Sequence, residues 1–308
     1  MDRLEAMRAF TAVATLGSFA EAARQLRISP SATTRLVADL EERLGLVLLN
    51  RTTRSVRLTE GGELYLERCR RVLEDVDDAE RAARGQGAEP RGVLKITAPV
   101  LFGRLYVMPI VNQVLAEHRQ LSIRLVLSDR NMHLIEEDLD VAIRIGDLAD
   151  SSLIAVRLGG VSRLLVASPD YLMWRSAPRG PADLTAHDVI AFEGIDATNE
   201  WRFEPSGKIV RVQPRLMVNC AESAIAAAEA GLGITRALSY QVKAGIAAGR
   251  LVPVLPQHTR EILPVSAVYP ARRIASANRA AFLSAAKAYL KTHSVTPFDE
   301  WAPAATAG

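Results

Sequence analysis

Residues 27 to 36 read RISPSATTRL, a stretch in which four hydroxyl side chains and a proline precede an arginine. Ser29 has the side chain of a helix N-cap and Pro30 suits the first helical position, so the stretch predicts a helix beginning at Pro30. Apolar residues then recur at helical spacing and define an inner face: Ala32, Leu36, Val37, Leu40 and Leu44. The same spacing places Ser31, Thr34 and Arg35 on the outer face, where short donors and one cation are open to a partner.

Two further helices and a hairpin surround this helix. In LGSFAEAARQL, Ser18 and Glu21 have the spacing of a capping box, which predicts a short helix just upstream. An apolar stripe over residues 4 to 14 predicts a longer first helix that ends at Gly17. Downstream, GLVLLNRTTRSVRLT gives short strands at residues 46 to 49 and 55 to 58 around an arginine-rich turn. The order is that of a helix-turn-helix followed by a wing.

Positive charge is concentrated in this region, although the whole chain carries a formal net charge of only +3. Residues 24 to 57 contain seven arginines against three carboxylates. Hydroxyls at a helix N-terminus bind phosphates and base edges, and a wing arginine suits a narrow, electronegative minor groove. The alternative is a solvated charged face, which is common for arginine. Because the motif, the hydroxyls and the arginines fall on the same side, we predict contact with a nucleic acid duplex.

The run GSFAEAARQLRISPSATTRLVADLEERLGLVLLNRTTRSVRLTEGG resembles the amino-terminal winged helix-turn-helix of LysR-type transcriptional regulators. The resemblance includes the Leu-Glu-x-x-Leu-Gly motif at residues 40 to 45 and the Arg-x-x-Arg-x-Val-x-Leu-Thr motif at residues 51 to 59. It implies a bacterial, sequence-specific transcriptional regulator that binds double-stranded DNA. The DNA contacts that we expect are Pro30, Ser31, Thr33, Thr34, Arg35, Arg51 and Arg54.

A long helix is predicted after the wing, with Thr59 placed to cap it. Its apolar residues recur at alternating steps of four and three, the seam of a two-stranded coil: Tyr65, Cys69, Val72, Val76, Ala79 and Ala83. The alternative is a helix lying on its own domain, but residues 60 to 89 carry nine acids against five arginines, so little besides the seam is apolar. We therefore expect a homodimer through this linker helix and an inverted-repeat operator. The resemblance also implies a homotetramer and allows RNA polymerase as a partner.

From Arg91 onward the pattern changes to short β-branched runs that alternate with helical stretches. The predicted strands are VLKITAP, LSIRLVLS, DVAIRIG, RLLVAS, VIAF, KIVRVQPRLMVN and PVSAVYP. Helical patterns lie at residues 103 to 118, 221 to 230 and 276 to 291, which indicates an α/β fold. The resemblance implies a periplasmic-binding-protein-like effector domain of two lobes, with lobe one at residues 91 to 161 and 266 to 295 and lobe two at residues 162 to 265.

The predicted organisation thus has three parts. Residues 1 to 59 form an all-α winged helix-turn-helix DNA-binding domain, residues 60 to 90 form the linker helix and a hinge, and residues 91 to 308 form the regulatory domain. Gly85, Gly87 and Pro90 end the helix and mark the hinge.

A small-molecule effector is expected beyond the carboxyl ends of the strands, where open parallel sheets bind ligands. The candidate contacts are Thr97, Ala98, Pro99, Val100, Arg130, Arg144, Gly146 and Cys220. Arg144 follows a buried strand and suits a carboxylate, so the effector is expected to be anionic. The alternative for Arg144 is a surface ion pair with a neighbouring acid such as Asp147.

The sequence does not contain the residue patterns that disulfide formation, metal binding or nucleophilic catalysis would require. Cys69 and Cys220 have no close partner in the sequence, no Cys/His cluster has metal-ligand spacing, and no serine lies in a nucleophile elbow. We therefore expect no catalytic residues, no metal and no cofactor, and both cysteines as small core residues; a redox role for Cys220 is the alternative. A solute-binding or enzymatic α/β domain fused to a DNA-binding head is the alternative function.

The compartment follows from the N-terminus and the hydropathy. MDRLEAMRAFTAV begins with alternating charges, and no stretch approaches about eighteen apolar residues. We expect a cytoplasmic protein without membrane contact, associated with the nucleoid when it binds DNA.

Overall fold

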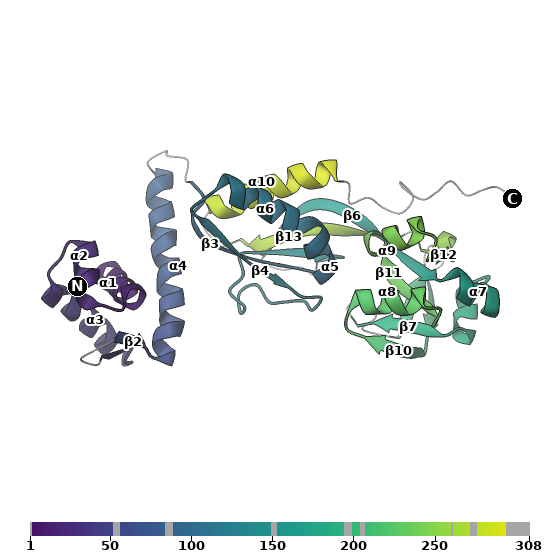
Figure 1. Ribbon diagram of the computed structural model, residues 1–308, viewed down its shortest axis with the longest axis horizontal. Coiled ribbons are helices and arrows are strands. Elements are labelled where there is room, and N and C mark those ends of the chain that lie inside the picture. Colours follow the sequence, from purple (N-terminus) through teal and green to yellow (C-terminus); the bar gives the residue numbers. More distant parts are fainter. Residues whose placement is uncertain are drawn as a thin grey trace. The chain divides into compact units, whose positions relative to one another are not determined.

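The computed structural model separates the chain into two units, Met1–Glu89 and Pro90–Gly308 (Figure 1). It describes residues 2–51, 56–83, 89–148, 153–193, 199–203, 207–259, 261–271 and 276–293. No helix in these ranges is long and apolar enough to cross a membrane.

The first unit contains the predicted winged helix-turn-helix and the long helix. Its elements are α1 (Arg3–Leu16), α2 (Phe19–Leu26), α3 (Pro30–Leu44), β1 (Leu49–Arg51), β2 (Val56–Leu58) and α4 (Glu60–Ala83). The predicted caps are confirmed, because the hydroxyls of Ser18, Ser29 and Thr59 accept from the backbone of the first turns of α2, α3 and α4. Gly17 and Gly45 end α1 and α3 in the left-handed conformation that favours glycine.

The long helix α4 packs on α1 of its own unit. Phe10, Val13, Val37 and Leu40 form the centre of this core, and Cys69 of α4 is completely buried in it. Tyr65 lies against Phe10, with ring centroids 5.7 Å apart. The seam was therefore predicted wrongly at Cys69, because the helix buries this residue against its own domain, and Tyr65 is half-buried beside it. The prediction that Cys69 is a small core residue is confirmed.

The wing is a two-stranded sheet in which Leu49, Asn50 and Arg51 of β1 pair antiparallel with β2. Its first strand begins three residues later than the predicted residue 46. The reason is Glu41 of α3, whose Oε1 accepts from the backbone N–H groups of Leu48 at 2.8 Å and Leu49 at 3.0 Å. The segment before β1 is thereby tied to α3 and does not pair with β2.

The second unit is an α/β domain. Its elements are β3 (Gly92–Ala98), α5 (Val100–Phe102), the π-helical turn η1 (Gly103–Val107), α6 (Met108–Glu117), β4 (Leu121–Leu127), β5 (Val141–Ile145), β6 (Leu153–Ala167), α7 (Pro169–Arg175), η2 (Pro181–Ala186), β7 (Val189–Phe192), β8 (Glu200–Phe203), β9 (Lys208–Arg211), β10 (Pro214–Val218), α8 (Ala221–Glu229), β11 (Ile234–Leu238), α9 (Ser239–Ala247), β12 (Val252–Val254), η3 (Pro256–His258), β13 (Ile262–Pro270) and α10 (Ala277–Thr292). The helices predicted near residues 221 and 276 are confirmed.

Two long strands, β6 and β13, run through both halves of this unit. The strand order is β10-β7-β11-β6-β13-β5-β3-β4, with β12 also paired to β6. The amino-terminal part of β6 pairs with β13, and its pairing with β11 begins at Arg163. We call the side that contains β3, β4 and β5 lobe one, and the side that contains β7, β10, β11 and β12 lobe two. Strands β3, β4 and β5 are parallel, so their carboxyl ends meet at one edge.

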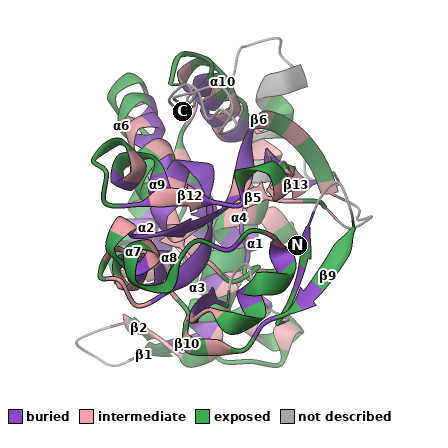
Figure 2. Ribbon diagram, turned by 90° about the vertical axis from the view of Figure 1, so that its right-hand side faces the viewer, coloured by how far each residue is buried: buried purple, intermediate pink, exposed green. Residues whose placement is uncertain are grey.

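Each lobe has a core of its own strands and helices, and Leu238 and Tyr240 of lobe two also pack into the core of lobe one. In lobe one, α6 and α10 cover one face of the strands, with Phe102, Ile110 and Phe282 buried between them (Figure 1). Lobe two is filled by two further clusters on opposite faces of its strands, one around Trp201 and one around Ile190. Buried residues gather on the strands and exposed ones on outer helical faces such as that of α7 (Figure 2). The cores hold the strand ends of both lobes in place.

Candidate functional site

The outer face of α3 carries exposed polar side chains at its N-terminus. Pro30, Ser31, Thr34 and Arg35 are all exposed. The hydroxyls of Ser29 and Ser31 lie 3.0 Å apart, and the Thr34 hydroxyl donates to the carbonyl of Pro30 at 3.0 Å. These bonds hold the hydroxyl oxygens in fixed positions at the start of the helix, with lone pairs left to accept a further bond.

Thr33 lies on the opposite side of α3 and is a correction. Its side chain is completely buried, and its hydroxyl donates to the carbonyl of Ser29 at 3.2 Å. The buried residues of α3 are Val37 and Leu40, which belong to the predicted stripe, and Thr33, which does not. The expected DNA contact at Thr33 is therefore wrong. Of the two wing arginines, Arg51 ends β1 but its side chain is outside the described residues, as is Arg54 altogether.

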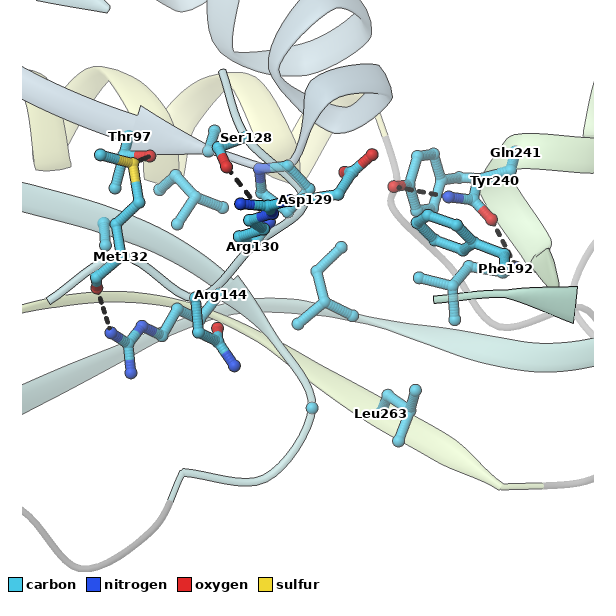
Figure 3. A pocket seen from close by; sticks show the side chains of 18 of the residues that line it. Thr97, Ser128, Asp129, Arg130, Met132, Arg144, Phe192, Tyr240, Gln241 and Leu263 are labelled. Carbon is cyan, nitrogen blue, oxygen red and sulfur yellow. Dashed lines mark hydrogen bonds between the residues drawn. The ribbon is translucent and has the colours of Figure 1, made fainter. Parts of the chain in front are cut away.

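A pocket of about 190 Å³ lies in the second unit where the two lobes meet (Figure 3). Lobe one contributes the carboxyl ends of β3 and β5 and the loop after β4, as expected for ligand binding at strand ends. Lobe two contributes Phe192 at the end of β7, and Leu238, Tyr240 and Gln241 at the start of α9. The volume is below the roughly 300–1,000 Å³ of sites for drug-sized ligands, so it suits a small metabolite.

Six of the eight predicted contacts line this pocket: Thr97, Ala98, Pro99, Arg130, Arg144 and Gly146. Val100 and Cys220 do not line it, and both expectations are corrected. The backbone N–H of Val100 already donates to Asp129 Oδ1 at 3.0 Å. Cys220 follows β10, which is the outermost strand of lobe two, and β7 lies between it and the lobe centre. Cys220 is instead the half-buried residue before α8.

The arginines of the pocket differ in their partners. Arg144 Nη2 donates to the carbonyl of Met132 at 2.9 Å, and within the described residues no ion pair joins it to Asp147, which was the alternative. Arg163 forms an ion pair with Glu261. Arg130 is exposed, and its backbone N–H donates to the Ser128 hydroxyl. The guanidinium groups give the pocket an excess of positive charge.

The structure adds residues that the sequence did not single out. Asp129 lines the pocket, and burial raises the pKa of its carboxyl, as does the charge of Glu222, while the bond from the Val100 N–H lowers it. Tyr240 is almost completely buried, and burial raises the pKa of its phenol well above the ordinary value. Asp129 is the chain neighbour of the predicted contact Arg130. The sequence did not predict the pocket residues of lobe two, because they reach the pocket only through the strands that cross between the lobes.

A winged helix-turn-helix followed by a two-lobed α/β domain with a small pocket at its strand ends is the construction of a ligand-responsive DNA-binding regulator. The comparisons with known proteins name the family. Residues 4–63 match the model of the bacterial regulatory helix-turn-helix protein, lysR family, and residues 87–291 match the LysR substrate binding domain. The chain belongs to the LysR-type transcriptional regulators.

Curated relatives match over nearly the whole chain. An HTH-type transcriptional repressor of Pseudomonas aeruginosa is 35% identical over 277 residues, which cover 89% of this chain and 87% of the relative. The HTH-type transcriptional activator AaeR of Escherichia coli is 35% identical over 272 residues, covering 87% and 88%. One relative is named a repressor and the other an activator, so similarity alone does not give the direction of regulation.

Solved structures agree with the fold. CrgA, a LysR-type regulator from Neisseria meningitidis, matches with a TM-score of 0.60 and 31% identity over 93% of this chain and 98% of that one. The virulence activator AphB of Vibrio cholerae matches with a TM-score of 0.58 and 27% identity over 94% and 99%. The chain is therefore a transcriptional regulator and not an enzyme. As a member of this family, it binds DNA and a small-molecule effector and forms oligomers.

Proposed function

We propose that the chain binds its operator through the N-terminal half of α3 and through the wing. The observation that carries this proposal is the exposure of Ser31, Thr34 and Arg35 on one side of α3, while the opposite side is buried in the core. Pro30 begins the helix beside them. Arg51 and Arg54 are proposed as the wing contacts on the strength of the family motif and their charge.

Two arginines of α3 provide a matched test. Arg35 lies in the second turn and Arg43 in the last turn, and both are exposed. Arg35→Ala should weaken binding to the preferred site by about 1–3 kcal/mol if the side chain reads a base. Arg43→Ala removes the same charge and should reduce only the weak, salt-dependent attraction. Footprinting and titrations at several salt concentrations separate the two. Equal losses for both variants would count against the assignment.

The proposed assembly is a homodimer that uses the exposed face of α4. Two apolar side chains on that helix remain open to solvent in the single chain: Leu64 is 67% exposed and Val72 is 40% exposed. Burying these side chains against a second copy would stabilise a dimer, and its two heads would bind an inverted repeat.

The family also supports a homotetramer and contact with RNA polymerase as further proposals. We also propose that the protein is cytoplasmic and associated with the nucleoid, because promoter DNA is located there.

The dimer proposal predicts that Val72→Asp produces monomers or aggregates, because a carboxylate would be buried against its own copy. Met173 is 79% exposed on α7, so Met173→Asp is the matched control. Sedimentation of the two variants gives the answer. If Val72→Asp has the same mass in solution as the wild type, the interface lies elsewhere.

For the effector, we propose a small anionic molecule in the pocket, where Arg130 and Arg144 supply the positive charge and Thr97, Ala98, Pro99 and Gly146 shape the wall. Its control of transcription requires that it bind one arrangement of the lobes and the oligomer more tightly than another. Thr97→Val and Arg144→Ala should abolish the effect of the effector on promoter output and leave basal DNA binding unchanged. A reporter assay and gel-shift measurements test this prediction. If both variants respond to the effector like the wild type, the effector binds elsewhere.

A further inference from the structure

Asp129 is a carboxylate in a pocket whose other charged lining residues are arginines. Arg130, Arg144 and Arg163 line the pocket with it. Among the described residues, no cation forms an ion pair with Asp129. Its Oδ1 accepts from the Val100 N–H at 3.0 Å, and no described group donates to Oδ2. One carboxylate oxygen is therefore left for a ligand.

Glu222, the other acid in this neighbourhood, is already neutralised. Arg104 of η1 pairs with Glu222 of α8 across the two lobes, with Nη2 and Oε1 2.6 Å apart. Asp129 has no such partner, and it is partly withdrawn from water, which raises the pKa of its carboxyl. A partly desolvated anion without a counter-charge is unfavourable unless a donor is supplied.

The side chain of Asp129 points away from the arginine side of the pocket. In Figure 3 its carboxylate is directed toward Tyr240 and Gln241 of lobe two, while Arg144 and Thr97 lie at the other side. Gln241 Nε2 lies 3.4 Å from the Tyr240 hydroxyl, and Gln241 Oε1 accepts from the backbone N–H of Leu238 at 2.8 Å. This end of the pocket therefore combines a carboxylate, a phenol and an amide.

Apolar side chains also line the pocket: Ile143 of lobe one, Phe192 of lobe two and Leu263 of β13. A ligand with charges only of negative sign would be attracted by the arginines and repelled by Asp129. A ligand with one anionic group and one donor group satisfies both ends.

We propose that the effector is a small monocarboxylate with an apolar middle and a hydroxyl or ammonium group at its far end, which donates to Asp129. This inference rests on the proposed function, in which the pocket between the lobes binds the effector. Hydroxy and amino acids share the donor that Asp129 requires, and the experiment distinguishes them.

The test measures thermal stability and binding of the full chain with three probe series: unsubstituted carboxylic acids, ω-hydroxy acids and ω-amino acids with matched aliphatic and phenyl spacers. We expect at least one donor-bearing series to bind about tenfold or more tightly than the unsubstituted acids, as befits a hydrogen bond to a charged group. Asp129→Asn should abolish a preference for amino acids and reduce one for hydroxy acids. Asn can still accept from the Val100 N–H, so the fold should be kept.

Asp183 provides the matched control, because its carboxylate also accepts backbone N–H groups but lies outside the pocket. Asp183→Asn should leave every preference unchanged. If unsubstituted acids bind as tightly as the donor-bearing ones, and Arg144→Ala weakens all of them, the inference fails and the anion-binding pocket stands. If no carboxylate in any series binds, or if Arg144→Ala alters nothing, both the inference and the proposed pocket fail.

Discussion

Glu41 connects the DNA-recognition helix to the wing, and its removal gives a sharply defined prediction. One oxygen of its carboxylate accepts from the N–H groups of Leu48 and Leu49, where the chain leaves α3 and enters β1. A hydrogen bond to a charged group contributes about 1.5–3 kcal/mol. Because one oxygen serves both donors, the two bonds do not add fully, and Glu41→Ala should destabilise the start of the wing by ~2–4 kcal/mol. Glu41→Gln keeps an acceptor and should cost about half as much.

Hydrogen exchange at the amides of Leu48 and Leu49 measures this effect directly. A loss of ~2–4 kcal/mol corresponds to exchange on the order of 30- to 1,000-fold faster. Glu42 is the matched control, since it is the next residue of the same helix and is exposed. Glu42→Ala changes the net charge equally and should leave both amides protected. If the two variants exchange at the same rate, the wing does not depend on the carboxylate of Glu41.

The same pair of variants separates wing placement from simple charge in DNA binding. Each substitution removes one negative charge from the head and should strengthen non-specific binding to a similar extent. Only Glu41→Ala also releases the wing, so only this variant should lose affinity for the preferred site relative to random DNA. A footprint in which the wing contacts persist in Glu41→Ala would refute the reasoning.

Two further predictions concern a glycine and a carboxylate. A Cβ on Gly62 would lie 2.1 Å from the carbonyl oxygen of Leu48, whereas one on Gly61 would meet nothing closer than 3.9 Å. Gly62→Ala should therefore lower the melting temperature of the DNA-binding domain, while Gly61→Ala should stabilise this domain by up to about 1 kcal/mol through helix propensity. Thermal melts followed by far-UV circular dichroism measure both effects. Equal effects of the two variants would contradict the close contact at Gly62. Burial raises the pKa of Asp129, so its charged form is less stable in the folded chain than in the unfolded one. Protonation of Asp129 therefore stabilises the folded chain relative to the charged form. This stabilisation is complete at pH values below the pKa of the unfolded chain and is lost as the pH rises through the pKa of the folded chain. Asp129→Asn should thus raise the ligand-free melting temperature at neutral pH and have little effect in acid, and a pH-independent difference would count against the argument.

Local features of the chain could be read from its sequence because they depend on neighbouring residues. The caps at Ser18, Ser29 and Thr59 and the glycines that end α1 and α3 follow from side-chain chemistry within one turn. Thr33 was misassigned because its hydroxyl suggested a surface residue. Thr33 lies four residues before Val37 and seven before Leu40, and this helical spacing places it on the buried face. Its buried hydroxyl donates to the carbonyl of Ser29.

Features that depend on distant residues could not be read in this way. The apolar stripe of α4 predicts that a partner is needed, but the same stripe fits a second copy of the helix or α1 of the same chain. Cys69 and Tyr65 pack on α1, and nothing in their spacing distinguishes the two. In the same way, strand ends in lobe one located Thr97 and Arg144, whereas Phe192 and Tyr240 reach the pocket only because β6 and β13 cross between the lobes.

The contacts between the lobes set what an effector must do to change their arrangement. Arg104 and Glu222 join the lobes through side chains that are 62% and 38% exposed, so this ion pair is screened and contributes on the order of 0–1 kcal/mol. Tyr240 of lobe two is also buried against Phe102 of lobe one, with ring centroids 5.4 Å apart. Reversing a two-state equilibrium from about 1:99 to 99:1 requires about 5.5 kcal/mol of differential binding. On the proposed mode of binding, a ligand that contacts Arg144 and Asp129 in lobe one and Tyr240 in lobe two gains its full affinity only when both lobes are in place. A ligand confined to one lobe gains the same affinity in every arrangement and shifts nothing, however tightly it binds.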